Sequence, residues 1–157
     1  MADHHTPLAR AVELARTGME AGAGYPFGAV IVKAGVVVAE AHNRVLANHD
    51  PTAHAEIEAL RLAGRTLATH DLTGCVLYAS GEPCPMCLGA IYWSGIVEVY
   101  YAGTVDEAAG IAFDDRYIFD QFALPPEKRK VTLNPLAGSR AEVAAIYREW
   151  AKRQGTS

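Results

Sequence analysis

Four side chains in two short stretches are of types that could do chemistry together. His54 and Glu56 stand in "PTAHAE", and Cys84 and Cys87 stand in "PCPMC". One imidazole and two thiols are ligands that Zn²⁺ prefers, and a Cys₂His set leaves the fourth position of a tetrahedral ion open. An open position is typical of catalytic zinc, because it admits the water or substrate that the ion activates. The sequence therefore predicts a catalytic zinc site on His54, Cys84 and Cys87.

Glu56 follows His54 by two residues. A carboxylate beside zinc is well placed to accept a proton from an attacking water and to return it later. We therefore expect Glu56 to be the general acid–base. The backbone N–H groups near Ala55 and Cys84 are candidate donors to the oxygen on which negative charge develops.

The cysteine pair has two other interpretations. A CxxC can be a redox pair, but that pattern does not usually come with an H-x-E on a separate helix. A closed structural zinc site needs a fourth ligand, and Cys75, His49 and His70 are not paired at close ligand spacing. Cys75 lies in an apolar run and is expected to be a buried small side chain.

The elements that must position these residues alternate between strand and helix. Apolar runs predict a hairpin over 28–41 with its turn at Ala34-Gly35, and strands over 75–80, 96–103 and 130–133. Helical spacing and capping residues predict helices that begin near Thr6, Thr52, Cys84, Asp114 and Ser139. The pattern favours an α/β domain with parallel strands. The zinc ligands would then lie at two helix N-termini, whose partial positive charge favours thiolates.

Composition restricts the class of protein. The chain has 157 residues, is 50% hydrophobic and carries a formal net charge of −4, so we expect a single globular domain over 1–157. No window is apolar enough to predict a membrane span, and no basic excess suggests nucleic acid as a partner. Three cysteines fit a reducing compartment, so we expect a cytoplasmic protein.

The complete pattern is specific. H-x-E followed by P-C-x-x-C is the signature of zinc-dependent nucleobase deaminases, and the chain resembles the cytidine deaminase-like superfamily. The resemblance covers about Tyr25 to Asp115, and within the superfamily the chain looks most like bacterial guanine deaminases. It is carried by "YPFGAVIV", "HNRV", "DPTAHAEIEALR", "EPCPMCLGAIYWSGI" and "GIAFDD".

The resemblance implies a three-layer α/β/α fold, in which a mixed, mostly parallel sheet is flanked by helices. It also implies a homodimer in which the C-terminal segment, about residues 135–157, is a candidate for exchange between subunits. The implied activity is zinc-dependent hydrolysis of a small purine: guanine and water give xanthine and ammonia. Guanosine deaminase and, more distantly, tRNA adenosine deaminase are alternatives, and a structural-zinc interaction module is the non-enzymatic one.

The resemblance also implies substrate contacts. Asn43 would bind the base through its amide, and Asp115 would accept hydrogen bonds from the N–H groups of guanine, with Asp114 as the adjacent alternative. Phe27 and Trp93 could wall in a planar ring. Each has a purely structural alternative: a turn for Asn43, a helix cap for Asp114, and core packing for the two aromatic residues.

The sequence departs from guanine deaminases at two places. Gly81 stands where these enzymes often carry a cysteine, outside the ligand set. The chain ends "KRQGTS", with no aromatic residue after Trp150, whereas some of these enzymes close the site with an aromatic residue from the partner's tail. Either another residue closes the site, or the pocket is more open and the substrate is larger or different.

Overall fold

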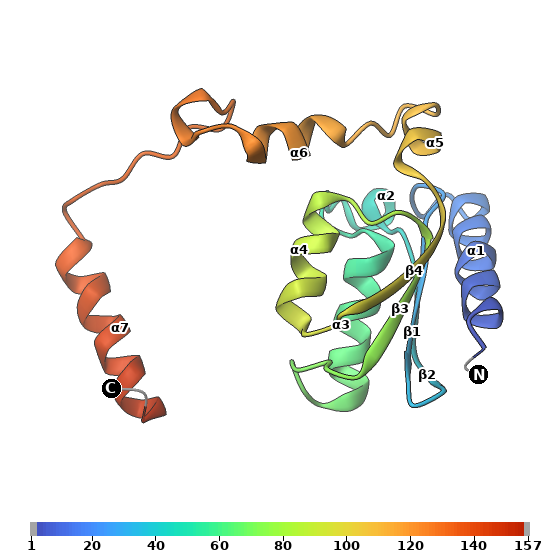
Figure 1. The fold of residues 1–157 in the computed structure, drawn as a ribbon, viewed down its shortest axis with the longest axis horizontal. Coiled ribbons are helices and arrows are strands. Elements are labelled where there is room, and N and C mark those ends of the chain that lie inside the picture. Colours follow the sequence, from blue (N-terminus) through green and yellow to red (C-terminus); the bar gives the residue numbers. More distant parts are fainter. Residues whose placement is uncertain (1–2, 156–157) are drawn as a thin grey trace. The chain divides into compact units, whose positions relative to one another are not determined.

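Strand β1, Gly28–Lys33, is a central strand of a four-stranded sheet in the computed structural model of the chain, which describes residues 3–155 (Figure 1). The strand order is β2-β1-β3-β4, with β2 at Val36–His42, β3 at Cys75–Gly81 and β4 at Glu98–Gly103. The first five residues of β1 are all buried. A strand covered on both faces reads as a continuous apolar run, which explains "GAVIV".

The predicted hairpin is confirmed. β1 and β2 pair antiparallel, and the register closes with Lys33 opposite Val36. The two turn residues, Ala34 and Gly35, have φ angles of 49° and 79°. Positive φ at both positions is the type I′ geometry that matches the twist of the flanking strands.

The sheet is mixed, as predicted, and three of its four described strands, β2, β3 and β4, point the same way. β1 also pairs antiparallel with β3, and only β3 and β4 pair parallel. The hairpin explains the one opposed strand: β2 and β3 point the same way, as a helical crossover requires, but β1 lies between them and opposes both. Hydrophobic patterns alone do not tell which strands become neighbours.

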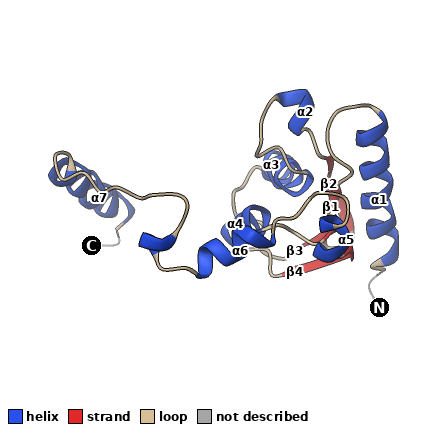
Figure 2. Cartoon of the chain, turned by 90° about the horizontal axis from the view of Figure 1, so that it is seen from above, coloured by secondary structure: helices blue, strands red, loops and turns tan. Residues whose placement is uncertain are grey.

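Helices cover both faces of this sheet, so the predicted three-layer α/β arrangement is confirmed (Figure 2). Helix α1, His5–Glu20, packs on one face over a cluster that includes Leu14 and Val30. Helices α3, Ala55–Leu67, and α4, Pro85–Ser94, lie on the other face. The larger core cluster, which includes Ile31 and Leu77, fills the space under them.

The remaining elements are short or follow the sheet. They are α2 Val45–Asn48, α5 Val105–Ala109, α6 Arg116–Ala123, the 3₁₀ helix η1 Pro126–Lys128, and α7 Arg140–Gln154. The described chain divides into two compact units between Phe119 and Asp120. The first unit holds the sheet, and the second holds η1 and α7. None of the described helices combines the length and apolar character needed to cross a bilayer.

Two local predictions in the second unit are wrong. No strand forms over 130–133, and Val131 and Leu133 are exposed. A strand needs a neighbour to bond its N–H and C=O groups, and the described residues provide none there. Ser139 makes no side-chain cap on α7; the capping box forms instead between Thr104 and Glu107 at the start of α5.

The single domain and the exchange of residues 135–157 stay predictions. The last two residues of that segment, 156–157, lie outside the described part of the chain.

Candidate active site

Both stretches that carry the ligands begin a helix. His54 is the N-cap of α3 and Cys84 is the N-cap of α4, each with extended backbone angles. Pro85 follows Cys84 at the first helical position, where its missing N–H costs nothing. Cys87 then comes three residues after the cap, on the same side of the first turn. The cap of this helix, predicted at Thr52, is therefore the ligand His54, two residues later, and the helix begins at Ala55.

The three ligand atoms converge. His54 Nδ1 lies 3.6 Å from Cys84 Sγ and 3.5 Å from Cys87 Sγ. All three ligand atoms lie within 4.8 Å of one another. Tetrahedral zinc with Zn–S of about 2.3 Å and Zn–N of about 2.05 Å holds its nitrogen and sulfur ligands about 3.5 Å apart. The donor set and its spacing therefore fit zinc.

The protonation of the ligands is also favourable. A hydrogen bond from the Cys87 thiol, together with His54, lowers the pKa of Cys84 to about 4. The same pairing raises the pKa of Cys87, so Cys84 loses its proton first. The hydrogen bond with Cys84 raises the pKa of His54. A thiolate thus stands ready for a divalent cation, which takes thiolate and neutral imidazole ligands.

Glu56 lies in the first turn of α3 beside these ligands, and its side chain lines the pocket described below. Only 7% of the residue is exposed. Burial raises its pKa to about 7, because a carboxylate loses its hydration there. A carboxyl group with a pKa near neutrality accepts and returns protons efficiently at physiological pH.

A pocket of about 360 Å³ opens over these residues. It lies in the size range of small-molecule sites. Its walls include Phe27 and Phe113, whose rings meet edge to face with centroids 5.4 Å apart. The Phe113 ring also contacts Tyr25, at 4.8 Å between centroids. The pocket therefore combines a polar floor with aromatic walls that suit a flat heterocycle.

The two adjacent aspartates at the pocket's rim have different environments. Asp115 Oδ1 is buried and has no hydrogen-bond partner among the described residues. Burial, followed by the charge of Cys84, raises the pKa of Asp115. Asp114 is instead bonded to Arg116, and half of its side chain is exposed. Only Asp115 therefore presents a free acceptor to a bound molecule.

Comparison with known proteins agrees with this geometry. Residues 1–103 match the family described as the cytidine and deoxycytidylate deaminase zinc-binding region. The chain belongs to this family. It is a zinc-dependent hydrolytic deaminase, and His54, Cys84 and Cys87 form a cluster that could hold the metal ion.

Several relatives of this deaminase have known activities or structures. Guanine deaminase of Bacillus subtilis is 50% identical over 129 residues, which is 82% of this chain and 83% of the relative. The X-ray structure of the B. subtilis enzyme superposes with a TM-score of 0.89 at 44% identity, covering 94% of each chain. A tRNA-specific adenosine deaminase of Aquifex aeolicus is 44% identical over 86 residues, 55% of this chain and 57% of the relative.

Asn43 of the deaminase has a structural task as well as a predicted binding task. The residue is 1% exposed, and its Oδ1 accepts hydrogen bonds from the backbone N–H groups of Tyr25 and Val45, both at 3.1 Å. The oxygen is therefore committed to the loop. Asn43 is not among the residues that line the pocket, so contact between its amide nitrogen and a substrate stays a prediction.

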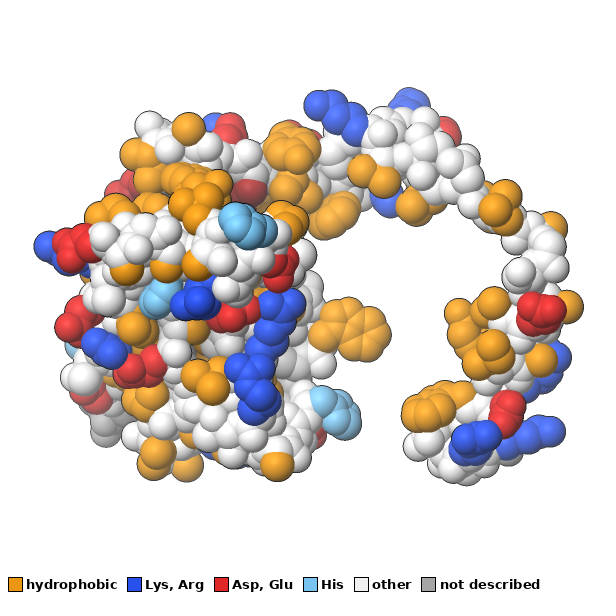
Figure 3. Space-filling view, turned by 180° about the vertical axis from the view of Figure 1, so that it is seen from behind, with side chains coloured by type: hydrophobic (Ala, Val, Ile, Leu, Met, Phe, Trp, Pro, Cys, Tyr) orange, Lys and Arg blue, Asp and Glu red, His pale blue; other side chains and the backbone are white. Residues whose placement is uncertain are grey.

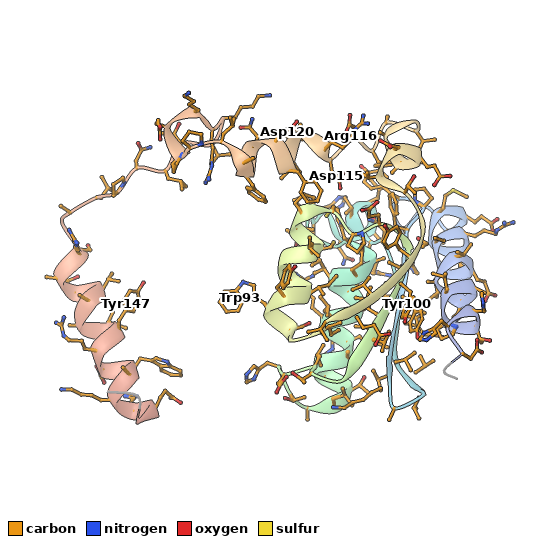
Figure 4. The ribbon with its side chains drawn as sticks, in the orientation of Figure 1. Trp93, Tyr100, Asp115, Arg116, Asp120 and Tyr147 are labelled. Carbon is orange, nitrogen blue, oxygen red and sulfur yellow. The ribbon has the colours of Figure 1, made fainter. Side chains whose placement is uncertain are left out.

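One predicted contact needs correction. Trp93 is 90% exposed, and its side chain points away from α4 and from the sheet (Figure 4). The buried residues of α4 include Cys87 and Ile91, and position 93 falls on the opposite side of the helix. Trp93 therefore does not wall in the substrate of this deaminase.

Ala55 lies where the sequence predicted it, at the start of a helix, but some of the residues that line the pocket were not predicted. Ala55 is fully buried at the first position of α3, where its backbone N–H has no acceptor within the helix. Sequence reasoning missed Phe113, Glu82 and Tyr117, which also line the pocket. Phe113 immediately precedes Asp114 in "GIAFDD", so its proximity to the predicted aspartates was the available signal.

Proposed function

We propose that this deaminase hydrolyses guanine to xanthine and ammonia. The observation that carries the proposal is the buried Glu56 carboxyl beside the metal ligands, together with the Asp115 Oδ1 atom on the same pocket, which is buried and has no hydrogen-bond partner among the described residues. Guanine has an amine-bearing ring carbon that would lie beside Glu56 and the metal ligands, and several N–H groups that would donate to Asp115. The similarity to B. subtilis guanine deaminase over most of both chains supports this choice.

Bound zinc supplies a Lewis acid that makes water a nucleophile near neutral pH. Glu56 takes the proton from the attacking water and passes it to the ring nitrogen next to the amine-bearing carbon. The proton of the new C–OH group then passes through the same carboxylate to the departing amine, so ammonia leaves as a neutral molecule and a C=O bond remains. The C–O bond formed replaces the C–N bond broken, and no oxidant or reductant is required.

Recognition of guanine uses the remaining groups. Asp115 accepts hydrogen bonds from ring and amino N–H groups, and such charge-assisted bonds are stronger than neutral ones. The Asn43 amide nitrogen donates to an acceptor on the ring. Phe27 and Phe113 exclude water from the flat faces of the base. An analogue without the donors would leave Asp115 buried and unpaired, which is costly.

A guanosine deaminase is the second candidate, because it would act on the same base with the same metal ligands and the same buried carboxyl group, Glu56. A tRNA substrate is less well supported. Figure 3 shows Asp and Glu side chains beside the Lys and Arg side chains on the face in view, and the chain carries a net charge of −4 rather than a basic excess. We therefore infer that the partner is a small purine and not a nucleic acid.

The substrate is tested by ammonia release from guanine, guanosine, adenine and cytosine, with the zinc content measured on the same preparation. We expect turnover of guanine well above that of the others. A preference for guanosine would select the second candidate, and zinc without any turnover would favour a structural-zinc module.

We also propose a cytoplasmic homodimer in which residues 135–157 are exchanged between subunits. The two metal-binding thiols need a reducing compartment. In the second unit, Val143, Ile146, Tyr147 and Trp150 form an exposed apolar stripe on α7 at helical spacing. Burial of this stripe against a second copy would stabilise the dimer, and light scattering tests the oligomeric state.

A further inference from the structure

Arg116 makes a two-pronged contact with Asp114, its neighbour but one. Arg116 Nε donates to Asp114 Oδ1 at 2.8 Å, and Nη2 donates to Oδ2 at 2.7 Å. The backbone N–H of Arg116 donates to the same Oδ1 at 3.2 Å. These bonds lower the pKa of Asp114, so the carboxylate stays ionised. Both oxygens of Asp114 are therefore occupied by Arg116 rather than free for a ligand.

The third nitrogen of the same guanidinium reaches another element. Arg116 Nη1 donates to Asp106 Oδ1 in α5 at 2.9 Å. Arg116 is the first residue of α6, and its rigid planar guanidinium thus joins the start of α6 to α5. We call Asp106, Asp114 and Arg116 the arginine clamp.

The segment that the clamp spans needs such a restraint. Ala112, between α5 and α6, has a φ of 72°, in the left-handed region that costs a non-glycine residue free energy. Phe113 anchors the segment on one side by its ring contacts with Tyr25 and Phe27. The arginine clamp anchors it on the other side. Asp115 lies between Asp114 and Arg116 in the chain, so the clamp restrains the backbone on both sides of it. The backbone carbonyl of Asp115 also accepts a hydrogen bond from the N–H of Ile118 at 2.9 Å.

We propose that Arg116 is a positioning residue for substrate binding: by clamping Asp114 and Asp106, it directs the neighbouring Asp115 carboxylate into the pocket (Figure 4). This rests on the proposed role of Asp115 toward guanine. Isolated exposed ion pairs contribute little, but two-pronged geometry within a network is the exception. The clamp also explains why two adjacent aspartates have different tasks.

The test uses zinc-loaded protein and steady-state kinetics with guanine for Arg116→Met, Asp114→Asn and the double variant. We expect each single change to raise KM about tenfold while kcat stays within about threefold, because a charged hydrogen-bond acceptor is displaced and the proton shuttle is not. The double variant should be no worse than either single one, because both break the same contact. Arg116→Lys should recover only part of the loss, since an ammonium cannot bind both oxygens as a fork.

Arg10→Met is the matched control. Arg10 also forks onto one carboxylate, Glu40, and reaches a second, Glu13, but on α1 and β2, away from the pocket. It should leave KM unchanged. Amide hydrogen exchange over residues 110–118 should accelerate in Arg116→Met and not in Arg10→Met.

Three results would overturn the inference. The first is an unchanged KM in Arg116→Met, and the second is additive effects in the double variant. The third is a KM that Asp114→Asn raises and Arg116→Met does not. The last would mean that Asp114 itself contacts the substrate. A wild-type protein inactive on guanine would instead overturn the proposed function, so the two failures are distinguishable.

Discussion

His54 Nδ1 lies 3.5 Å from Cys87 Sγ, although the two residues are 33 positions apart in the chain. The contact exists because α3 and α4 lie on the same face of the sheet and begin at the same end of it (Figure 1). Each helix uses its first turn to present a ligand, and the partial positive charge of both helix ends favours the thiolate form of the cysteines.

Removal of a zinc ligand should abolish metal binding. In His54→Ala or Cys87→Ala only two ligands remain, so we expect zinc content to fall toward zero, turnover to be lost and Tm to fall. Mass spectrometry for metal and thermal denaturation measure these effects. Cys75→Ala is the matched control, because Cys75 is 2% exposed in β3 and outside the ligand cluster. Loss of zinc from Cys75→Ala would contradict the assignment.

Glu56 should be needed for turnover but not for the metal. Glu56→Gln keeps the size of the side chain but cannot carry protons, so we expect kcat to fall about a thousandfold at unchanged zinc content. Glu58→Gln is the control on the same helix turn, where the carboxylate is bonded to Arg61 at 2.7 Å. Normal turnover in Glu56→Gln with normal zinc would rule out the proton-transfer role.

The buried Glu56 should also make the zinc-free protein less stable as the pH rises. Its folded-state pKa of about 7 lies above the ordinary value of 4.5, so the folded form binds the proton more tightly than the unfolded form. The contribution of Glu56 to the free energy of unfolding is fully present below the ordinary pKa of 4.5 and is lost as pH rises through about 7. In zinc-free protein, the Tm of wild type minus the Tm of Glu56→Gln should therefore be larger at about pH 5 than at about pH 8. An identical difference at both pH values would count against the raised pKa.

The two tasks of Asn43 should separate by substitution. Asn43→Ala leaves the backbone N–H groups of Tyr25 and Val45 without their acceptor, at about 1–3 kcal/mol for each buried group. Asn43→Asp keeps an acceptor but loses the amide nitrogen, so its Tm should lie closer to wild type. Both variants should show a raised KM for guanine. Asn48→Asp, at an exposed position in α2, is the control, and wild-type KM in Asn43→Asp would exclude the amide nitrogen from binding.

Local sequence signals predicted the elements well and their partners less well. Positive φ at Ala34-Gly35 and the proline after Cys84 act within a few residues, so the hairpin and the start of α4 could be recognised. The "KVTL" strand and the Ser139 cap were wrong for the opposite reason. A strand depends on a neighbour elsewhere in the chain, and a cap depends on the exact angles at one residue.

The sequence by itself determined the chemistry of this protein. The H-x-E and P-C-x-x-C stretches carry the residues predicted to bind zinc and to transfer protons, and each places them at a helix start by local rules. Only the tertiary structure decided which residues surround that chemistry. It turned Trp93 outward, brought Phe113 to the pocket wall, and held Asp114 on Arg116 while Asp115 stayed free. These outcomes depend on packing and pairing between elements, which neighbouring residues in the sequence do not specify.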